Sequence, residues 1–156
     1  MMLSNYVATV SSSAIARKSA FIYLVYVKEI KALYVGQTYS KYGALGRFTQ
    51  HLSETNSNTL KQRVCAIYNY DEYEFEEVFF NAVKLSDTKS FNQTNAEYRE
   101  AVEAIVNNKI ITFASNNKLG FVISRIQANP YTKESFVMSE ADSVSSIFAS
   151  WLLKVA

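Results

Sequence analysis

The segment from residue 21 to residue 36 constrains the fold of this chain more than any other, because two apolar stretches flank one short break. Apolar residues fill Phe21 to Val27 and return from Ala32 to Val35. The four residues 28–31 between them suit a hairpin loop. The sequence therefore predicts a β-hairpin that is apolar on both faces, and we expect other elements to cover both sides.

Pairing Val27 with Ala32 across the loop fixes the register of this hairpin. Tyr23 then lies opposite Gly36, and side chains alternate between the two faces along each strand. One face carries two phenols and a glycine: Tyr23, Val25, Ala32, Tyr34 and Gly36. The other face carries ordinary core side chains: Ile22, Leu24, Tyr26, Leu33 and Val35.

A short helix is expected after the hairpin, where the chain turns through Gly43 and Gly46. Arg47 and His51 are four residues apart, so a helix places both on one face, about one turn apart. An arginine clamps phosphate oxygens through two hydrogen bonds, and His and Tyr transfer protons near neutral pH when their surroundings tune them. Together with the two phenols, these groups suit the chemistry of a phosphodiester.

In this order the residues resemble the GIY-YIG nuclease family. The first motif is Phe21-Ile22-Tyr23, with Phe in place of the leading Gly, and the second is Tyr34-Val35-Gly36. Arg47 and His51 fit the Arg and His that many family members carry on the next helix. Each motif alone is short, but the two in this order, followed by the Arg/His pair, are fairly specific.

The resemblance implies hydrolysis of DNA with one bound Mg²⁺ or Mn²⁺. The family holds this metal with a Glu on a later helix, and Glu97 is the matching residue here. Tyr23 then helps to activate the attacking water, and Arg47 neutralises the charge that develops on the phosphate. Tyr34 and His51 orient groups or relay a proton. The residues expected to contact the substrate are Gly36, Gln37, Lys41 and Arg63.

Glu97 also attracts attention from the residues alone. A helix is expected from Asn95 to about Lys109, with Glu97 in its first turn, where the helix dipole stabilises a carboxylate and favours a hard cation. The alternative is that Glu97 serves only the cap of the helix. An Asn often completes the family's set of residues, and we assign it to Asn116, with Asn108 as the rival.

Composition limits the class of protein. The chain has 156 residues, a net charge of +2 and a mean hydropathy of −0.06, which is typical of one globular domain of ordinary size. Cys65 is the only cysteine and His51 the only histidine, which excludes an internal disulfide and a structural zinc cluster. Because there is neither a long apolar run nor a signal peptide, we expect a cytoplasmic protein without membrane contact.

Three regions are expected along the chain. Residues 1–20 form an N-terminal arm whose basic end either frays or contacts DNA, and residues 21–117 form the domain that resembles the nuclease family. Residues 118–156 form a C-terminal extension, with apolar positions at helical spacing from residue 143 to residue 156. We expect this helix to pack on the same domain; the alternative is that it pairs with a second copy in a homodimer.

The remaining elements complete an α/β prediction of the α+β type. A helix is expected over Thr59–Tyr68, a strand with an acidic outer end over Asp71–Val83, and a further strand over Gly120–Ile126. These give a small, mainly antiparallel sheet of three or more strands flanked by helices. The predicted function is a metal-dependent DNA endonuclease. The alternatives on the same fold are a catalytically inactive nucleic-acid-binding module and a protein–protein interaction module.

Overall fold

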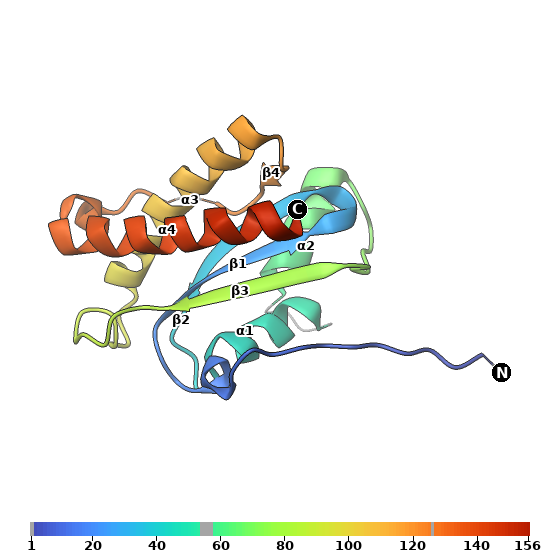
Figure 1. Ribbon diagram of the computed structural model, residues 1–156, viewed down its shortest axis with the longest axis horizontal. Coiled ribbons are helices and arrows are strands. Elements are labelled where there is room, and N and C mark those ends of the chain that lie inside the picture. The colour runs from blue at the N-terminus through green and yellow to red at the C-terminus, as the bar shows by residue number, and fades with distance from the viewer. Residues whose placement is uncertain (1, 54–57, 126) are drawn as a thin grey trace.

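A four-stranded mixed sheet lies at the centre of the computed structural model, which describes residues 2–53, 58–125 and 127–156 (Figure 1). The strand order is β3-β1-β2-β4. β1 pairs antiparallel with both of its neighbours, and β4 pairs parallel with β2. The strands are β1 (Phe21–Val27), β2 (Ala32–Thr38), β3 (Val78–Lys84) and β4 (Phe121–Val122). The predicted fold class, a small sheet flanked by helices, is confirmed.

The register of the β1–β2 hairpin is also as predicted. Val27 pairs with Ala32 across the loop, and Tyr23 pairs with Gly36. A single turn of 3-10 helix, η2 (Lys28–Ile30), fills the loop, and Lys31 closes it in the left-handed conformation at φ 50°. Because a shift of one residue would exchange the two apolar faces, this register decides which side chains lie in each half of the core.

Four α-helices and two further 3-10 helices surround the sheet in the described ranges. The α-helices are α1 (Gly43–Leu52), α2 (Thr59–Tyr68), α3 (Glu97–Asn117) and α4 (Ser135–Val155). The 3-10 helices are η1 (Ser13–Ala16) and η3 (Pro130–Lys133). None of the helices in these ranges has the length and apolarity needed to cross a membrane.

The structure corrects the predicted bounds of four elements. α4 begins at Ser135, eight residues before the predicted start at residue 143. α3 continues to Asn117 because Ile110 and Ala114, four residues apart, extend its buried side. β3 begins only at Val78, because the Glu29 carboxylate accepts the backbone N–H groups of two residues in the acidic stretch before it. β4 has two residues instead of seven, and Ile126, the expected end of that strand, lies outside the described residues.

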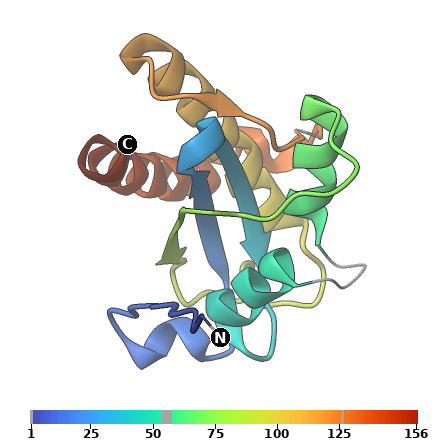
Figure 2. The same ribbon diagram turned by 90° about the vertical axis from the view of Figure 1, so that its right-hand side faces the viewer.

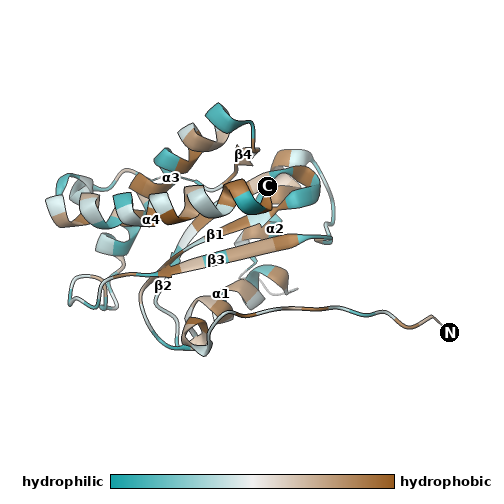
Figure 3. Cartoon of the chain, viewed as in Figure 1, coloured by the Kyte–Doolittle hydropathy of each residue, from teal (hydrophilic) through white to brown (hydrophobic). Residues whose placement is uncertain are grey.

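Helices cover both faces of the sheet, as the doubly apolar hairpin requires. Figure 2 shows α3 and α4 on one side and α1 and α2 on the other. Ile22, Leu24 and Val35 face the first pair of helices, and Tyr23 and Val25 face the second side. In Figure 3 the central strands are mostly brown to pale, whereas α3 and α4 carry both brown and teal residues.

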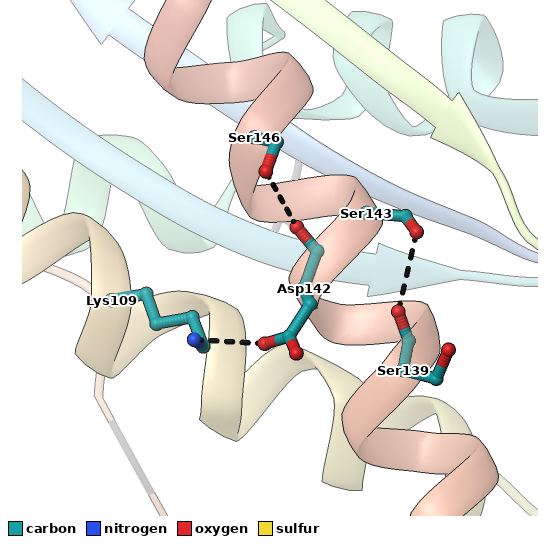
Figure 4. A network of polar contacts seen from close by, with 5 residues as sticks. All are labelled: Lys109, Ser139, Asp142, Ser143 and Ser146. Atoms are coloured by element: carbon teal, nitrogen blue, oxygen red, sulfur yellow. Dashed lines mark hydrogen bonds and ion pairs between the residues drawn. The ribbon is translucent and has the colours of Figure 1, made fainter.

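α4 docks through the apolar stripe that the sequence predicts. Of the predicted positions, Val144, Phe148 and Leu152 are buried in the core shared with α3 and the sheet, and Val137 and Ala141 extend this stripe toward the start of the helix. On the exposed side, the Lys109 ammonium lies 2.8 Å from the Asp142 carboxylate (Figure 4). An exposed ion pair of this kind contributes at most about 1 kcal/mol, so the buried apolar side chains hold this helix in place.

Candidate active site

The phenol of Tyr23 is the centre of a buried polar cluster between β1 and α1. Its ring is 1% exposed, and its Oη lies 2.8 Å from His51 Nε2. Arg47 donates from Nε to the same oxygen at 3.4 Å. Arg47 and His51 lie about one turn apart on α1, so their four-residue spacing brings both to one oxygen as the sequence predicts.

The hydrogen bonds of His51 determine which ring nitrogen carries the proton. Nδ1 accepts the backbone N–H of Leu60 at 3.3 Å, so the proton of the neutral ring is on Nε2 and is donated to Tyr23 Oη. Burial, followed by the charge of Arg47, lowers the pKa of His51 to about 3. His51 is therefore a neutral donor, and the Tyr23 oxygen accepts two N–H groups.

Thr59, the first residue of α2, links the second predicted phenol to the arginine. Its Oγ1 lies 3.2 Å from the Tyr34 hydroxyl and accepts Arg47 Nη2 at 3.1 Å. Arg47 also donates from Nη1 to Gln50 Oε1 at 2.9 Å. These contacts fix the plane of the guanidinium while its Nε faces Tyr23.

Gly36 is required because the Tyr23 ring crosses it. A Cβ built on Gly36 would lie 2.3 Å from both Cζ and Oη of Tyr23, a distance that no real side chain tolerates. Any larger residue would push the phenol off the sheet and away from its two donors.

The Tyr23 phenol is neutral at neutral pH. Burial raises its pKa, with the neighbouring Tyr34 second, and Arg47 partly offsets this effect through its charge and its hydrogen bond. Ionising this phenol therefore requires additional positive charge nearby.

Glu103 on α3, which the sequence analysis missed, is a carboxylate whose charge acts on this cluster. Burial raises the pKa of Glu103 to about 8, with the charge of Glu100 second and Arg47 acting in the opposite direction. The charge of Glu103 also raises the pKa of Tyr23. Its carboxylate therefore lies within the electrostatic reach of both Arg47 and Tyr23.

Glu97, the predicted metal ligand, lies elsewhere. Its side chain is exposed and its charge raises the pKa of Tyr131, while its backbone oxygen accepts Asn129 Nδ2 at 2.8 Å. The buried Val106 is nine positions after Glu97 on the helix. At 100° per residue, the two side chains lie about 180° apart, on opposite sides of the helix. Glu103 is only about 60° from Val106, so a helical wheel distinguishes the two carboxylates.

The two predicted asparagines also lie away from the cluster. Asn116 is exposed in the last turn of α3, thirteen residues after Glu103, or about 20 Å along the helix axis. Asn108, the rival, is exposed as well.

A different asparagine, Asn107, shares a cavity of about 200 Å³ with Glu103. It is 2% exposed, and its Oδ1 accepts the hydroxyl of Ser124 at 2.5 Å. That hydroxyl oxygen in turn accepts the backbone N–H of Val35 at 3.1 Å. The Nδ2 group of Asn107 is buried without a hydrogen-bond partner. This polar cavity therefore contains an N–H donor that no described protein group satisfies.

The other residues predicted to contact substrate, Gln37, Lys41 and Arg63, lie in three different places. Gln37, one residue after Gly36, accepts Arg99 Nε at 2.9 Å beside the cluster. Lys41 is exposed in the turn before α1. Arg63 donates from Nε to the backbone oxygen of Ile123 at 3.0 Å, so it fastens the end of β4 to α2.

Only a sparse metal site fits these residues. Within residues 2–53, 58–125 and 127–156, no group of three or more His, Cys, Asp or Glu side chains is close enough to hold a metal ion. Glu103 offers one hard oxygen donor, and the described part of the chain gives its carboxylate no hydrogen-bond donor. One carboxylate completed by water and substrate phosphate oxygens is a common way to bind Mg²⁺.

Comparison of the chain with models of known protein families, with curated proteins and with solved structures gives no match.

Proposed function

We propose that this chain is a metal-dependent DNA endonuclease that hydrolyses phosphodiester bonds with GIY-YIG-type chemistry. The observation that carries the proposal is the convergence of His51 Nε2 and Arg47 Nε on the oxygen of Tyr23, at 2.8 and 3.4 Å. A packing role alone does not explain a buried phenol that accepts two N–H groups and whose pKa responds to the charge of a carboxylate, Glu103. The sequence resemblance to the nuclease family supports the same chemistry.

Tyr23 is proposed to accept the proton of the attacking water as the phenolate, after its own hydroxyl proton has been released to bulk water. The two N–H groups on its oxygen stabilise the phenolate, because hydrogen bonds to a charged form favour that form. His51 remains a donor throughout, since its low pKa keeps the ring neutral. Arg47, fixed by Thr59 and Gln50, neutralises charge that develops on the phosphate.

Glu103 is the proposed metal ligand in place of Glu97. A divalent cation at this position supplies positive charge to the scissile phosphate and lowers the pKa of nearby oxygen acids. The site fits such a cation, because burial and the charge of Glu100 raise the pKa of this half-buried carboxylate more than Arg47 lowers it, so its ionised form gains from added positive charge.

A cleavage assay with a matched pair of tyrosine variants tests the proposal. Plasmid, single-stranded and branched DNA are incubated with Mg²⁺, Mn²⁺ or EDTA, using the wild type, Tyr23→Phe and Tyr26→Phe. Tyr26 is a buried tyrosine on the same strand but faces the opposite side of the sheet, so it controls for packing.

We expect cleavage with either metal and none with EDTA. Tyr23→Phe should lower the rate by about 10²- to 10⁴-fold, the usual contribution of a proton-transfer group, while Tyr26→Phe should cleave like the wild type. Folded wild type that cuts none of the substrates would overturn the proposal. Binding of DNA without metal-dependent cleavage would instead support the inactive binding module.

A further inference from the structure

A second pocket, distinct from the one that Glu103 lines, opens beside Arg47. It has a volume of about 420 Å³. Three cationic side chains line it, and none of the described residues around it is acidic. We call it the basic pocket; it is lined by Lys18, Gln37, Thr38, Tyr39, Arg47, Thr94 and Arg99. The cavity beside Glu103 is lined by two carboxylates and one arginine, Arg125, so an anion is favoured in the basic pocket instead.

Arg99 is a buried charge in this pocket, and no carboxylate forms an ion pair with it among the described residues. It is 4% exposed, and Nε donates to Gln37 while Nη1 donates to the backbone oxygens of Phe91 and Gln93, at 2.8 and 2.5 Å. Its guanidinium carbon lies 5.1 Å from the centre of the Tyr39 ring. The neutral acceptors hold the guanidinium in place without cancelling its charge, which is unusual for a buried arginine.

The remaining donors point to a phosphate ligand. Within the described ranges, Nη2 of Arg99 has no hydrogen-bond acceptor from the protein. The Lys18 ammonium lies 4.9 Å from the same Tyr39 ring. Thr38 accepts the backbone N–H of Ser40 through Oγ1, which leaves its hydroxyl hydrogen available to donate. Two cations and a hydroxyl around one pocket match the tetrahedral oxygens of a phosphate.

We propose that the basic pocket binds a backbone phosphate of the DNA strand next to the scissile one. Arg47 lines this pocket and also donates to Tyr23 Oη, so a phosphate held by Arg99 and Lys18 lies beside the reacting group. Naming the ligand as a DNA phosphate rests on the proposed nuclease function. The site itself requires only a phosphate group.

Two exposed positions allow a test without disturbing the fold. Lys18→Gln removes a cation, and Thr94→Glu places a carboxylate where it competes with phosphate for Arg99. Lys154→Gln removes an equally exposed cation at the end of α4 and serves as the control. Binding of labelled DNA is followed by fluorescence anisotropy in EDTA at several salt concentrations, so that cleavage does not interfere.

We expect Lys18→Gln to weaken DNA binding about 3- to 10-fold and to reduce the salt dependence by about one phosphate contact. Thr94→Glu should weaken it by about 10-fold or more, and Lys154→Gln should bind like the wild type. Equal affinity and salt dependence in Lys18→Gln, Thr94→Glu and the wild type would overturn the proposal, even if the protein cleaves DNA.

A second readout separates this proposal from the nuclease function. Inorganic pyrophosphate is titrated while the Arg99 Nε–H resonance is followed by NMR in the wild type and in Thr94→Glu. A saturable shift in the wild type, weakened about 10-fold or more in Thr94→Glu, supports the phosphate site even if no DNA is cut. If this resonance does not shift but the protein cleaves DNA normally, the nuclease proposal is supported and the proposal of a phosphate site in the basic pocket is wrong.

Discussion

The phenol of Tyr23 lies directly over the backbone of Gly36, its partner across the β1–β2 hairpin. The absence of a side chain at this one position lets the ring lie against the sheet while its hydroxyl reaches α1. The glycine of one strand and the tyrosine of the other therefore act as a single unit. This pairing explains why the two motifs of the hairpin occur at a fixed separation.

Gly36→Ala should displace the Tyr23 phenol from His51 and Arg47. The new Cβ would lie 2.3 Å from the ring's Oη, so the ring must move or the strands must separate. We expect a loss of stability of about 1–3 kcal/mol, as for other overpacked positions, and a loss of cleavage comparable to that of Tyr23→Phe. Urea denaturation and the cleavage assay measure the two effects.

The same substitution in a Tyr23→Ala background provides the control. Gly36 does not have a positive φ, so alanine there is strained only by the tyrosine ring. With the ring removed, Gly36→Ala should cost less than about 0.5 kcal/mol, which gives a coupling energy of at least about 0.5 kcal/mol between the two positions. An equal cost in both backgrounds would contradict the pairing that we describe.

Glu103→Gln and Glu97→Gln should differ sharply in metal-dependent cleavage. Gln keeps the volume of Glu but binds a divalent cation poorly, so Glu103→Gln should abolish activity at ordinary Mg²⁺ concentrations. Glu97→Gln, six residues earlier on the same helix, should remain within about threefold of the wild type. Cleavage rates of the two variants are measured over a Mg²⁺ titration. If Glu97→Gln lowers the rate more than Glu103→Gln does, Glu97 and not Glu103 is the metal ligand.

The residues that the sequence placed well are those governed by local geometry. The hairpin register follows from its loop and its apolar faces, and the contact of Arg47 and His51 with Tyr23 follows from a four-residue helical spacing. Glu103 and Arg99 were missed because their roles depend on how α3 lies against β2. A helical wheel anchored on the buried Val106 places Glu97 on the opposite side. No local pattern shows the basic pocket, because its lining residues come from distant parts of the chain, between Lys18 and Arg99.

We expect the buried apolar side chains of α4 to hold this helix on the domain, and the exposed Lys109–Asp142 ion pair to contribute little. Phe148 is fully buried, so Phe148→Ala should cost about 3–5 kcal/mol. Lys109→Ala removes only the exposed contact with Asp142 and should cost less than about 1 kcal/mol. Urea denaturation monitored through Trp151, half-buried on the same helix, measures both. Similar costs for the two variants would indicate that the helix is docked by electrostatics.

His51 should make the fold less stable as the pH falls below about 6.5. Its pKa is about 3 in the folded chain and about 6.5 when unfolded, so between these values only the unfolded state binds the proton. The contribution of His51 to the free energy of unfolding is therefore fully present above its unfolded pKa of about 6.5 and is lost as the pH falls. The loss between pH 7.5 and pH 5 is about 2 kcal/mol.

The variant His51→Gln isolates this contribution, because Gln does not titrate and other groups such as Glu103 are present in both proteins. Free energies of unfolding are measured by urea denaturation at pH 5, 6, 7 and 7.5. The stability of the wild type relative to His51→Gln should decrease by about 2 kcal/mol from the highest pH to the lowest. A difference that stays constant would mean that the folded imidazole takes up its proton as readily as the unfolded one. Such a ring would be cationic at pH 5, and it could not keep the neutral donor role that the bond from Leu60 assigns to it.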